Sequence, residues 1–322
     1  MNLDAVKTLV TGELAAVSDL IMERISSSIA LANEIADYIF ANGGKRMRPM
    51  LLLLVAKALG NQNPDQYKLA AIVELLHTAT LLHDDVIDES TMRRNHPTAN
   101  AKWGNEASVL VGDLLYTKAF QLIAEVDHSE LTQLLAQSTS IIVEGEVLQL
   151  MHRHDTSTNE QTYLDIIQRK TGELFAITTA AMPVFLNMSQ AETQSLRDYG
   201  MNLGIAFQMI DDALDYIADP EETGKNLGDD LAEGKLTLPL IYILDHGSET
   251  EKTLIKTAIQ NKGTDDLPAI QQAIQASNAI DYTLAQAEQF ADRARGALAC
   301  LDESEAKQGL IALTKYTVNR KR

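Results

Sequence analysis

Two short runs of aspartate have the residue types and the spacing of a site for a divalent cation. The first run is Asp84-Asp85-Val86-Ile87-Asp88, and the pattern recurs as Asp211-Asp212-Ala213-Leu214-Asp215. In a helix, the first and last aspartates of each run lie one turn apart on the same face. Two carboxylates about 4 Å apart repel each other by roughly 4 kcal/mol at an effective dielectric constant of ~20, so a bound cation would stabilise them. Carboxylate oxygens suit Mg2+ better than zinc, and Mg2+ commonly also binds a phosphate oxygen of a substrate.

The sequence around each run favours this interpretation over an exposed helix turn. Residues 70–82 before the first run are too uniformly apolar for a surface helix, and the largely apolar stretch 203–210 precedes the second run. A single copy of the pattern would fit an exposed turn better. Two copies in the same setting favour the metal site.

A basic loop with two glycines could bind the phosphate groups that such a metal site implies. The loop is Gly43-Gly44-Lys45-Arg46-Met47-Arg48-Pro49, and the apolar run from Met50 to Ala58 follows it. The glycines permit an unusual turn, and Pro49 suits the first turn of a helix. Cations are disfavoured at a helix N-terminus, but backbone N–H groups bind an anion there, and the anion would offset the conflict. The pattern predicts a diphosphate-binding loop, with an exposed basic turn as the alternative.

Other polar residues flank the first run. His77 lies seven residues before Asp84, about two turns away on nearly the same helix face. It is either a ligand or a buried core histidine. Arg93 and Arg94 follow the run closely, and arginine offers a fixed fork of donors for phosphate oxygens.

Composition predicts an all-α protein with one domain over residues 1–322. Of the 322 residues, 45% are hydrophobic and only 5% are aromatic, and there are 7 prolines. Ala, Leu, Ile and Gln recur at helical spacing. The chain is long enough for a large core in one domain or two, and no linker or low-complexity tract divides it.

Helical periodicity predicts packing helices along most of the chain, including residues 3–40, 50–58, 70–88, 106–124, 131–151 and a segment from Glu160 to Pro183. Within these, Gly145 would let two helices approach closely. Residues 219–235 are rich in glycine and acidic residues, which predicts a mobile loop that could bring Lys225 or Lys235 to a phosphate. The basic end, Arg320-Lys321-Arg322, is expected to be a solvated tail.

Charge and cysteine content limit the partners and the compartment. The net charge of −18 argues against nucleic acid and anionic membrane surfaces as partners. The lone Cys300 excludes an internal disulfide framework, and the start of the sequence lacks a signal-peptide pattern. No uninterrupted apolar run approaches the ~18 residues needed to cross a bilayer. These features predict a cytoplasmic protein without stable membrane insertion.

In their order along the chain, these motifs resemble those of the trans-isoprenyl diphosphate synthases, and the resemblance is closest to the long-chain bacterial members. It covers nearly the whole chain and rests on the glycine loop, both aspartate runs, Arg93-Arg94, Lys170-Thr171, Phe207-Gln208, Gly224-Lys225, Ala79 to His83 and Gly145 to Leu150. The resemblance implies an isoprenoid-synthase-type helical bundle around a deep central cavity, usually in a homodimer. It also implies head-to-tail addition of isopentenyl diphosphate to an allylic diphosphate, with about two or three Mg2+ ions per active site.

The resemblance also assigns roles residue by residue. Mg2+ would be held against the allylic diphosphate by Asp84, Asp88 and Asp211, with support from Asp85, Asp212 and Asp215. The allylic substrate would be contacted by Arg93, Lys170, Thr171, Gln208 and Lys225 or Lys235. Isopentenyl diphosphate would be held by Lys45, Arg48, His77 and Arg94. Mg2+ would stabilise the departing diphosphate, apolar walls would exclude water, and the diphosphate itself would take the proton, so no protein base is needed.

Small residues near the first run predict a long product. Ala79 and Thr80 lie five and four residues before Asp84, about one turn deeper along the expected cavity wall. Their size leaves room for a growing chain, whose end would be stopped by a residue such as Phe120 or Ile123. We expect farnesyl diphosphate as the primer and a product near eight isoprene units for quinone side chains, delivered to the membrane.

Three alternatives remain open from the sequence. A class I terpene cyclase shares the first aspartate run but normally has a different second metal motif and lacks the basic loop. A di-iron carboxylate bundle would use the Glu-x-x-His pairs Glu74/His77 and Glu125/His128, although the second pair lies in a polar run that resembles a turn. A non-catalytic subunit of a heteromeric synthase would keep the fold, but both aspartate runs are complete here.

Overall fold

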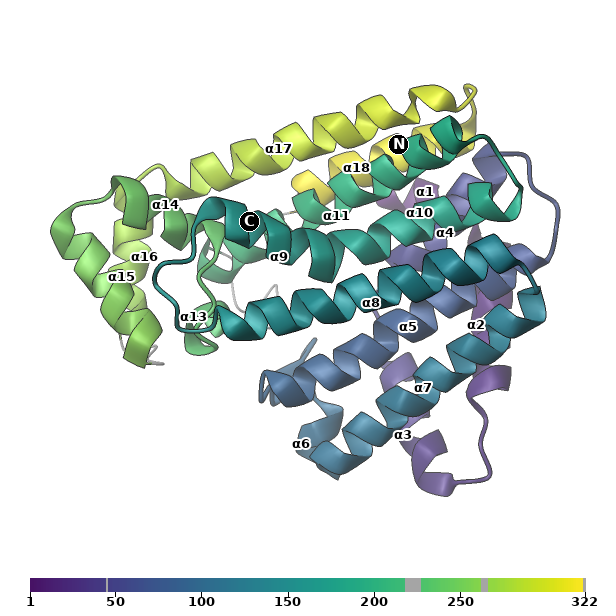
Figure 1. The fold of residues 1–322 in the computed structure, drawn as a ribbon, viewed down its shortest axis with the longest axis horizontal. Helices are drawn as coiled ribbons and strands as arrows, with labels where there is room; N and C mark the ends of the chain where they lie inside the picture. Colours follow the sequence, from purple (N-terminus) through teal and green to yellow (C-terminus); the bar gives the residue numbers. More distant parts are fainter. Residues whose placement is uncertain (45, 218–226, 262–265, 321–322) are drawn as a thin grey trace. The chain divides into compact units, whose positions relative to one another are not determined.

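The computed structural model describes residues 1–44, 46–217, 227–261 and 266–320, and these are almost entirely helical (Figure 1). They form two compact units. Unit 1 consists of Met1–Ala136, Ile177–Arg197 and Leu298–Leu313, and unit 2 consists of Gln137–Ala176, Asp198–Ala297 and Thr314–Arg322. Helices α8, α10, α11 and α18 contribute residues to both units. The all-α prediction is confirmed, whereas a single domain and a deep central cavity stay predictions.

Unit 1 is built around two buried helices, α4 and α5. Its helices include α1 (Leu3–Thr8), α2 (Thr11–Ile25), α3 (Ala30–Ala41), α4 (Met47–Ala58), α5 (Asp65–Ile87), α6 (Ala99–Trp103) and α7 (Asn105–Val126). Every residue of α4 from Pro49 to Ala56 is buried, as expected for a helix that is apolar on all sides. Helix α5 packs along α7 and also contacts α2 and α4.

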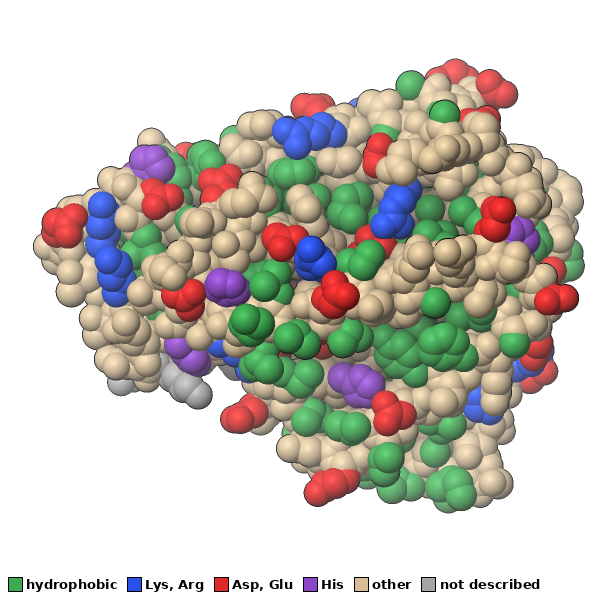
Figure 2. Space-filling view, in the orientation of Figure 1, with side chains coloured by type: hydrophobic (Ala, Val, Ile, Leu, Met, Phe, Trp, Pro, Cys, Tyr) green, Lys and Arg blue, Asp and Glu red, His purple; other side chains and the backbone are tan. Residues whose placement is uncertain are grey.

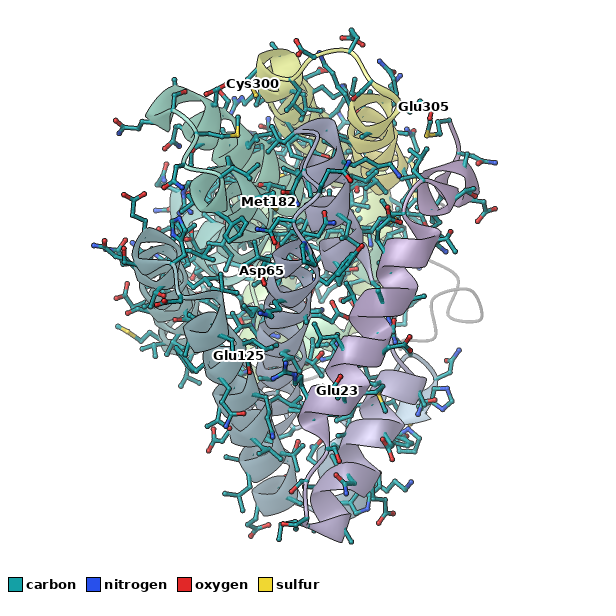
Figure 3. All side chains as sticks on the ribbon, turned by 90° about the vertical axis from the view of Figure 1, so that its right-hand side faces the viewer. Glu23, Asp65, Glu125, Met182, Cys300 and Glu305 are labelled. Carbon is teal, nitrogen blue, oxygen red and sulfur yellow. The ribbon has the colours of Figure 1, made fainter. Side chains whose placement is uncertain are left out.

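Short features complete unit 1. The strands β1 (Met92–Arg93) and β2 (His96–Pro97) form an antiparallel hairpin directly after α5, which the sequence did not predict. Met182 lies fully buried in this unit, whereas Cys300, in the short helix η2 (Leu298–Cys300), is exposed (Figure 3). Helix α7 is long and apolar enough to cross a membrane by length and composition, and it packs along α5.

The α-helices that follow α7, together with one π-helical turn, belong wholly or partly to unit 2. They are α8 (Ser129–Met151), α9 (Glu160–Ile167), the π-helical turn η1 (Gln168–Gly172), α10 (Glu173–Phe185), α11 (Gln190–Ile217), α13 (Asp229–Ala232), α14 (Leu238–His246), α15 (Glu249–Asn261), α16 (Leu267–Ala276), α17 (Ala279–Ala297) and α18 (Glu305–Val318). Helix α14 is the centre of one cluster and contacts α15, α16 and α17 (Figure 1). Its buried Leu240 and Ile243 belong to the same apolar core as Met209 of α11.

Glycines bring the backbone of η1 close to two long helices. A Cβ added to Gly145 of α8 would lie 2.7 Å from the Lys170 backbone nitrogen, which confirms the predicted close approach. A Cβ added to Gly204 of α11 would lie 2.8 Å from the Cα of Gly172. Such distances are too short for any side chain, so only glycine fits at these crossings.

Candidate active site

The first aspartate motif (Asp84–Asp88) lies at the C-terminal end of α5. The Asp88 backbone N–H donates to the Asp84 carbonyl at 2.8 Å, so these two residues are one helical turn apart, as their spacing predicts. Both side chains are partly exposed, whereas Asp85 is only 4% exposed. Arg93 of the hairpin donates to Asp85 Oδ1 from Nε at 2.9 Å and from Nη2 at 2.7 Å. Burial raises the pKa of Asp85, and the Arg93 charge partly offsets that rise.

A basic cluster in unit 1 contains most of the residues predicted to hold isopentenyl diphosphate. Arg48 Nη1 lies 3.0 Å from His77 Nε2, and the guanidinium must be the donor because it has no acceptor atom. Burial, followed by the charges of Arg48 and Arg94, lowers the pKa of His77 well below 6.5, so the ring is neutral. Arg94 lies so close to Gly44 that an added Cβ would meet its Nη2 at 2.5 Å. The prediction for Lys45 falls outside the described residues.

The basic cluster also contains one acidic residue, Glu74. Burial raises the pKa of Glu74, while the charges of Arg48, Arg46 and Arg94 oppose that rise. Arg46 is the N-cap of α4 in the left-handed conformation (φ 49°), and its Nη1 donates to Ser18 Oγ of α2. The sequence alone offers Glu74 as a candidate metal ligand, whereas its position among arginines makes it their counter-charge.

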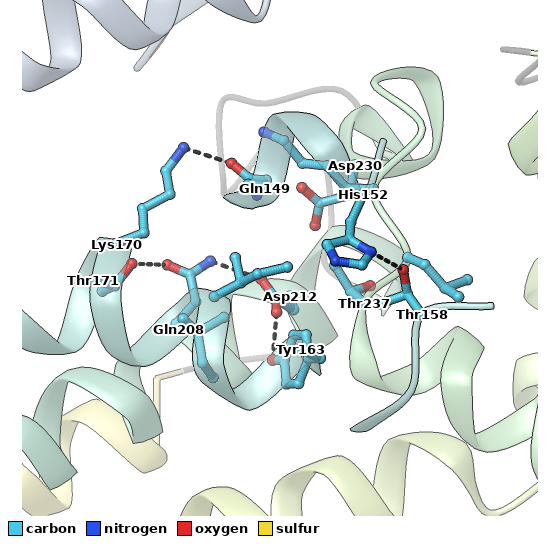
Figure 4. A pocket seen from close by; sticks show the side chains of 14 residues that line it. Gln149, His152, Thr158, Tyr163, Lys170, Thr171, Gln208, Asp212, Asp230 and Thr237 are labelled. Carbon is cyan, nitrogen blue, oxygen red and sulfur yellow. Dashed lines mark hydrogen bonds between the residues drawn. The ribbon is translucent and has the colours of Figure 1, made fainter. Parts of the chain in front are cut away.

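The second aspartate motif (Asp211–Asp215) lies near the end of α11, and its middle residue is held by neutral donors. Tyr163 Oη donates to Asp212 Oδ2 at 2.6 Å, and Gln208 Nε2 donates to Oδ1 at 2.7 Å (Figure 4). Thr171 Oγ1 in turn donates to Gln208 Oε1 at 2.9 Å. Burial, with the nearby charge of Asp230, raises the pKa of Asp212 to about 8. Thr171, Gln208 and Asp212 therefore form one hydrogen-bonded chain that ends at Tyr163.

Lys170 is placed beside this chain by the π-helical turn. Its Nζ donates to Glu146 Oε2 at 2.6 Å and to Gln149 Oε1 at 2.7 Å, both on α8. Figure 4 shows the bond to Gln149. π-Helical turns add one residue to a helix and are frequent at functional sites. A cavity of about 90 Å3 in unit 2 is lined by residues of this group, including Lys170, Thr171, Gln208, Asp212, Asp230 and Lys235.

The segment before α14 is fastened to the second motif. Asp215 Oδ1 and Oδ2 accept hydrogen bonds from the backbone N–H groups of Asp229 and Asp230, each at 3.2 Å. The Asp215 carbonyl also accepts from the Gly228 N–H at 3.0 Å. Asp215 therefore fixes the start of α13, and Lys235 follows shortly after that helix. The prediction for Lys225 falls outside the described residues.

The expectation of a solvated C-terminal tail is wrong for Arg320. Its Nη2 donates to the Phe207 carbonyl at 2.9 Å, and its guanidinium lies 4.0 Å from the centre of the Phe207 ring. Its Nη1 is 3.7 Å from Asp211 Oδ1. Burial lowers the pKa of Arg320, and the Asp211 charge opposes that change. A basic residue at a chain end gave no signal that it would pair with an acid so far away in sequence.

Comparison with known proteins identifies the family. Residues 29–277 match the model of the family described as polyprenyl synthetase. The octaprenyl diphosphate synthase of Escherichia coli (strain K12) is 42% identical over 323 residues, which covers 100% of both chains. The all-trans-nonaprenyl-diphosphate synthase of Rhodobacter capsulatus is 43% identical over 312 residues, 97% of this chain and 96% of that one. A crystal structure of the polyprenyl synthase from Caulobacter crescentus, complexed with calcium and isoprenyl diphosphate, has a TM-score of 0.95, 41% identity and coverage of 99% and 98%.

The chain belongs to the polyprenyl synthetase family. Members of this family are prenyltransferases that join isopentenyl diphosphate to an allylic diphosphate and depend on Mg2+ in general, and this chain is a prenyltransferase. The assignment separates it from the class I terpene cyclases that the first aspartate motif alone would allow.

The residues of the di-iron alternative serve other purposes in this polyprenyl synthase. His77 accepts from Arg48 at 3.0 Å, which places a cation where iron would have to bind. Glu125 forms an ion pair with Arg24 of α2. His128 lies in the turn before α8, where its Nδ1 accepts from the Leu131 N–H at 3.2 Å. The first Glu-x-x-His pair therefore lies within the basic cluster, and the histidine of the second pair lies at the start of α8.

The residues predicted to set product length differ in how exposed their side chains are. Ala79 is fully buried on α5, and Thr80 is partly buried with its hydroxyl bonded to the His77 carbonyl. Ile123 of α7 is 4% exposed, whereas Phe120 is 47% exposed. The roles of Ala79, Thr80, Phe120 and Ile123 in product length stay predictions.

Proposed function

We propose that this polyprenyl synthase extends an allylic diphosphate, with farnesyl diphosphate as the primer, to an all-trans product of about eight isoprene units for quinone side chains. The observation that carries the proposal is the pocket at the second aspartate motif. There, Lys170 and Thr171 of η1, Gln208 of α11 and Lys235 line one pocket together with Asp212. This combination of cations and neutral donors beside carboxylates fits a metal-bound diphosphate.

The carboxylates fit Mg2+ as the metal of the site. Among the described residues, no group of three or more acidic, histidine or cysteine side chains could hold a metal ion by itself. Mg2+ does not need such a group, because it keeps several waters and binds substrate phosphates alongside one or two carboxylates. We assign the protein ligands to Asp84, Asp88 and Asp211. When bound, Mg2+ would supply Lewis-acid stabilisation of the negative charge on the leaving diphosphate.

The protein residues would divide the remaining work between two diphosphates. Lys170, Thr171, Gln208, Lys235 and Arg93 would orient the allylic diphosphate, and Asp85, Asp212 and Asp215 would hold those donors in place. Arg48, Arg94 and the neutral His77 would bind isopentenyl diphosphate. We keep Lys45 and Lys225 in these two groups on the strength of the sequence motifs. Because the departing diphosphate can accept the proton of the final step, no side chain is assigned as a base.

Product length is proposed from the small residues beside the first motif. The relatives with nearly equal identity carry different product names, octaprenyl at 42% and nonaprenyl at 43%, so overall similarity does not decide the number of units. Ala79 leaves space one turn from Asp84, and Ile123 is the candidate for the residue that ends the cavity. Replacing Ala79 by Tyr is expected to shorten the product, and an unchanged length would remove Ala79 from the mechanism.

A homodimer is proposed from the exposed apolar side chains of α7. Leu110 is 67% exposed and Phe120 is 47% exposed, an unusual setting for large apolar groups on one helix. Figure 2 shows hydrophobic side chains at the surface over α7. Leu110→Glu should shift the mass measured by light scattering from dimer to monomer, whereas the same change at the exposed but polar Gln121 should not. We also keep the cytoplasm as the proposed location.

The decisive experiment is turnover by the purified chain alone. Farnesyl diphosphate, labelled isopentenyl diphosphate and Mg2+ should give a dephosphorylated lipid that migrates near eight isoprene units in chromatography. Activity without any second protein would also exclude the non-catalytic subunit alternative. Absence of product with every allylic primer would contradict the proposed function.

A further inference from the structure

We infer that His154, in the connection between α8 and α9, is a positioning residue that sets where Lys235 enters the pocket at the second aspartate motif. This inference rests on the proposed function, because it takes Lys235 as a contact of the allylic diphosphate. His154 itself does not line the pocket, so it would act only through the backbone beside Lys235.

His154 connects three segments of unit 2. Its backbone N–H donates to the Gly234 carbonyl at 2.9 Å, directly before Lys235. Its ring Nδ1 lies 2.7 Å from the Ile259 carbonyl in the last turn of α15. A carbonyl can only accept, so Nδ1 carries the proton and donates. The ring therefore fastens the α8–α9 connection to α15, and its backbone fastens Gly234 to the same point.

The His154 ring also occupies the space that a side chain at position 234 would need. A Cβ added to Gly234 would lie 2.1 Å from ring atoms Cε1 and Nδ1 of His154. Gly234 has φ 71° and His154 has φ 61°, so both residues adopt the left-handed conformation, which is costly for most side chains other than those of Asn and Asp. Two unusual backbone conformations thus meet at one contact, immediately before Lys235.

The backbone of Lys235 is held from both sides. Its N–H donates to the Asp230 carbonyl at 2.8 Å, and the Gly234 N–H donates to the Leu231 carbonyl at 3.0 Å. Asp215 of the second motif holds the start of the segment, and His154 holds its end. With both ends fixed, the Lys235 side chain needs less ordering when a diphosphate binds, and pre-ordering of this kind increases affinity.

The test is a comparison of Michaelis constants in the full-length enzyme. His154→Ala should raise KM for the allylic diphosphate about tenfold, while KM for isopentenyl diphosphate stays within about twofold, because a small displacement of a binding group weakens only its own substrate. His154→Asn should restore most of the affinity, because Asn tolerates positive φ and carries an amide close to the position of Nδ1. His246→Ala is the matched control, since it removes a ring bonded to the Tyr242 carbonyl at 3.1 Å, away from Gly234.

A suppressor pair tests the contact itself. Gly234→Ala places a methyl group against the His154 ring and should raise the same KM more than His154→Ala does. Adding His154→Gly to Gly234→Ala removes the ring and should recover part of the loss, since the remaining Ala is still strained at φ 71°. If the double variant is no better than Gly234→Ala, the ring contact has no positioning role.

Turnover-independent data separate this inference from the proposed function. Amide hydrogen exchange in residues 228–237 should speed up in His154→Ala and return to the wild-type rate in His154→Asn. Wild-type enzyme without prenyltransferase activity would overturn the proposed function, but hydrogen exchange could still test the positioning role of His154. Unchanged exchange, or equal rises in both Michaelis constants, would overturn the positioning role of His154.

Discussion

The two aspartate motifs share a sequence pattern but differ in what holds their middle residue. Asp85 is paired with the charged guanidinium of Arg93 through two contacts of 2.9 and 2.7 Å. Asp212 accepts instead from the neutral groups of Tyr163 and Gln208, at 2.6 and 2.7 Å. Identical spacing therefore does not imply an identical electrostatic setting.

The difference extends to the surroundings of each motif. The first is followed by an arginine hairpin and lies in the same unit as His77, which burial and the charges of Arg48 and Arg94 keep neutral. The second is surrounded by hydrogen-bonded polar groups, and its buried Asp212 has a pKa of about 8. The arginines of the first region thus provide positive charge that suits a free anion. The second region instead provides directed hydrogen-bond donors that suit the orientation of an anion.

The largest expected effect is on kcat and concerns the proposed metal ligands, which both motifs contain. Asp84→Asn and Asp211→Asn each remove one proposed metal ligand, and each should lower kcat on the order of 10³-fold, because metal stabilisation of the leaving group contributes several kcal/mol. Steady-state kinetics over a range of Mg2+ concentrations checks this. Activity restored by excess Mg2+ in one variant only would show that the motifs do not share a role.

Substitution of the middle residues, Asp85 and Asp212, should change the free energy of unfolding by different amounts. Asp85→Asn leaves the Arg93 guanidinium without its carboxylate and should lower the free energy of unfolding by about 2 to 3 kcal/mol, less than for a fully buried pair because the Arg93 side chain is 32% exposed. Asp212→Asn removes a carboxylate that burial disfavours and should cost at most about 1 kcal/mol. Urea unfolding measures both values. Equal losses would contradict the contrast drawn between the motifs.

The buried, neutral His77 predicts one contribution to the pH dependence of stability, located in the first region. Because the folded protein holds the pKa of His77 well below 6.5, only the unfolded chain takes up this proton as the pH falls. The contribution of His77 to stability is therefore complete above pH 6.5 and is lost below it, by up to about 2 kcal/mol at pH 5. His77→Gln, which cannot be charged, should flatten this part of the curve of unfolding free energy against pH. A curve with the wild-type slope would assign the effect to other groups.

The smallest expected effect concerns the neutral donors of the second motif. Tyr163→Phe removes one hydrogen bond to Asp212 and should lower the free energy of unfolding by about 1 kcal/mol. It should also raise KM for the allylic diphosphate more than KM for isopentenyl diphosphate, because Asp212 orients Gln208. Tyr282→Phe, which loses a hydroxyl bonded to Glu160 outside the pocket, is the control. A larger kinetic effect of the control would contradict the role of Tyr163.

The sequence predicted the features that depend on local patterns. Apolar runs of helical spacing placed the helices that carry Asp84 and Asp212, and the glycine loop predicted the start of α4 beside its arginines. The positions of Lys170 and Thr171 were found by motif, but the π-helical turn that directs them has no pattern of its own.

The partners across long separations could not be predicted. Tyr163 lies 49 positions from Asp212, and Arg320 binds the Phe207 carbonyl 113 positions away. Such pairs arise from the packing of whole helices, which no local periodicity records. The same reason explains why the exposure of Phe120 could not be predicted: its apolar character is visible in the sequence, but the direction of its side chain on α7 is not.

The glycine crossings at η1 limit how this enzyme can be engineered. Gly172 and Gly204 touch so closely that even a methyl group at position 204 would collide with backbone at 2.8 Å. Gly172 directly follows Lys170 and Thr171, so a side chain inserted at this crossing would displace both of these donors together with η1. Directed-evolution libraries aimed at altered substrate choice should therefore keep both glycines, since a substitution at either position would reduce substrate affinity and protein stability at the same time.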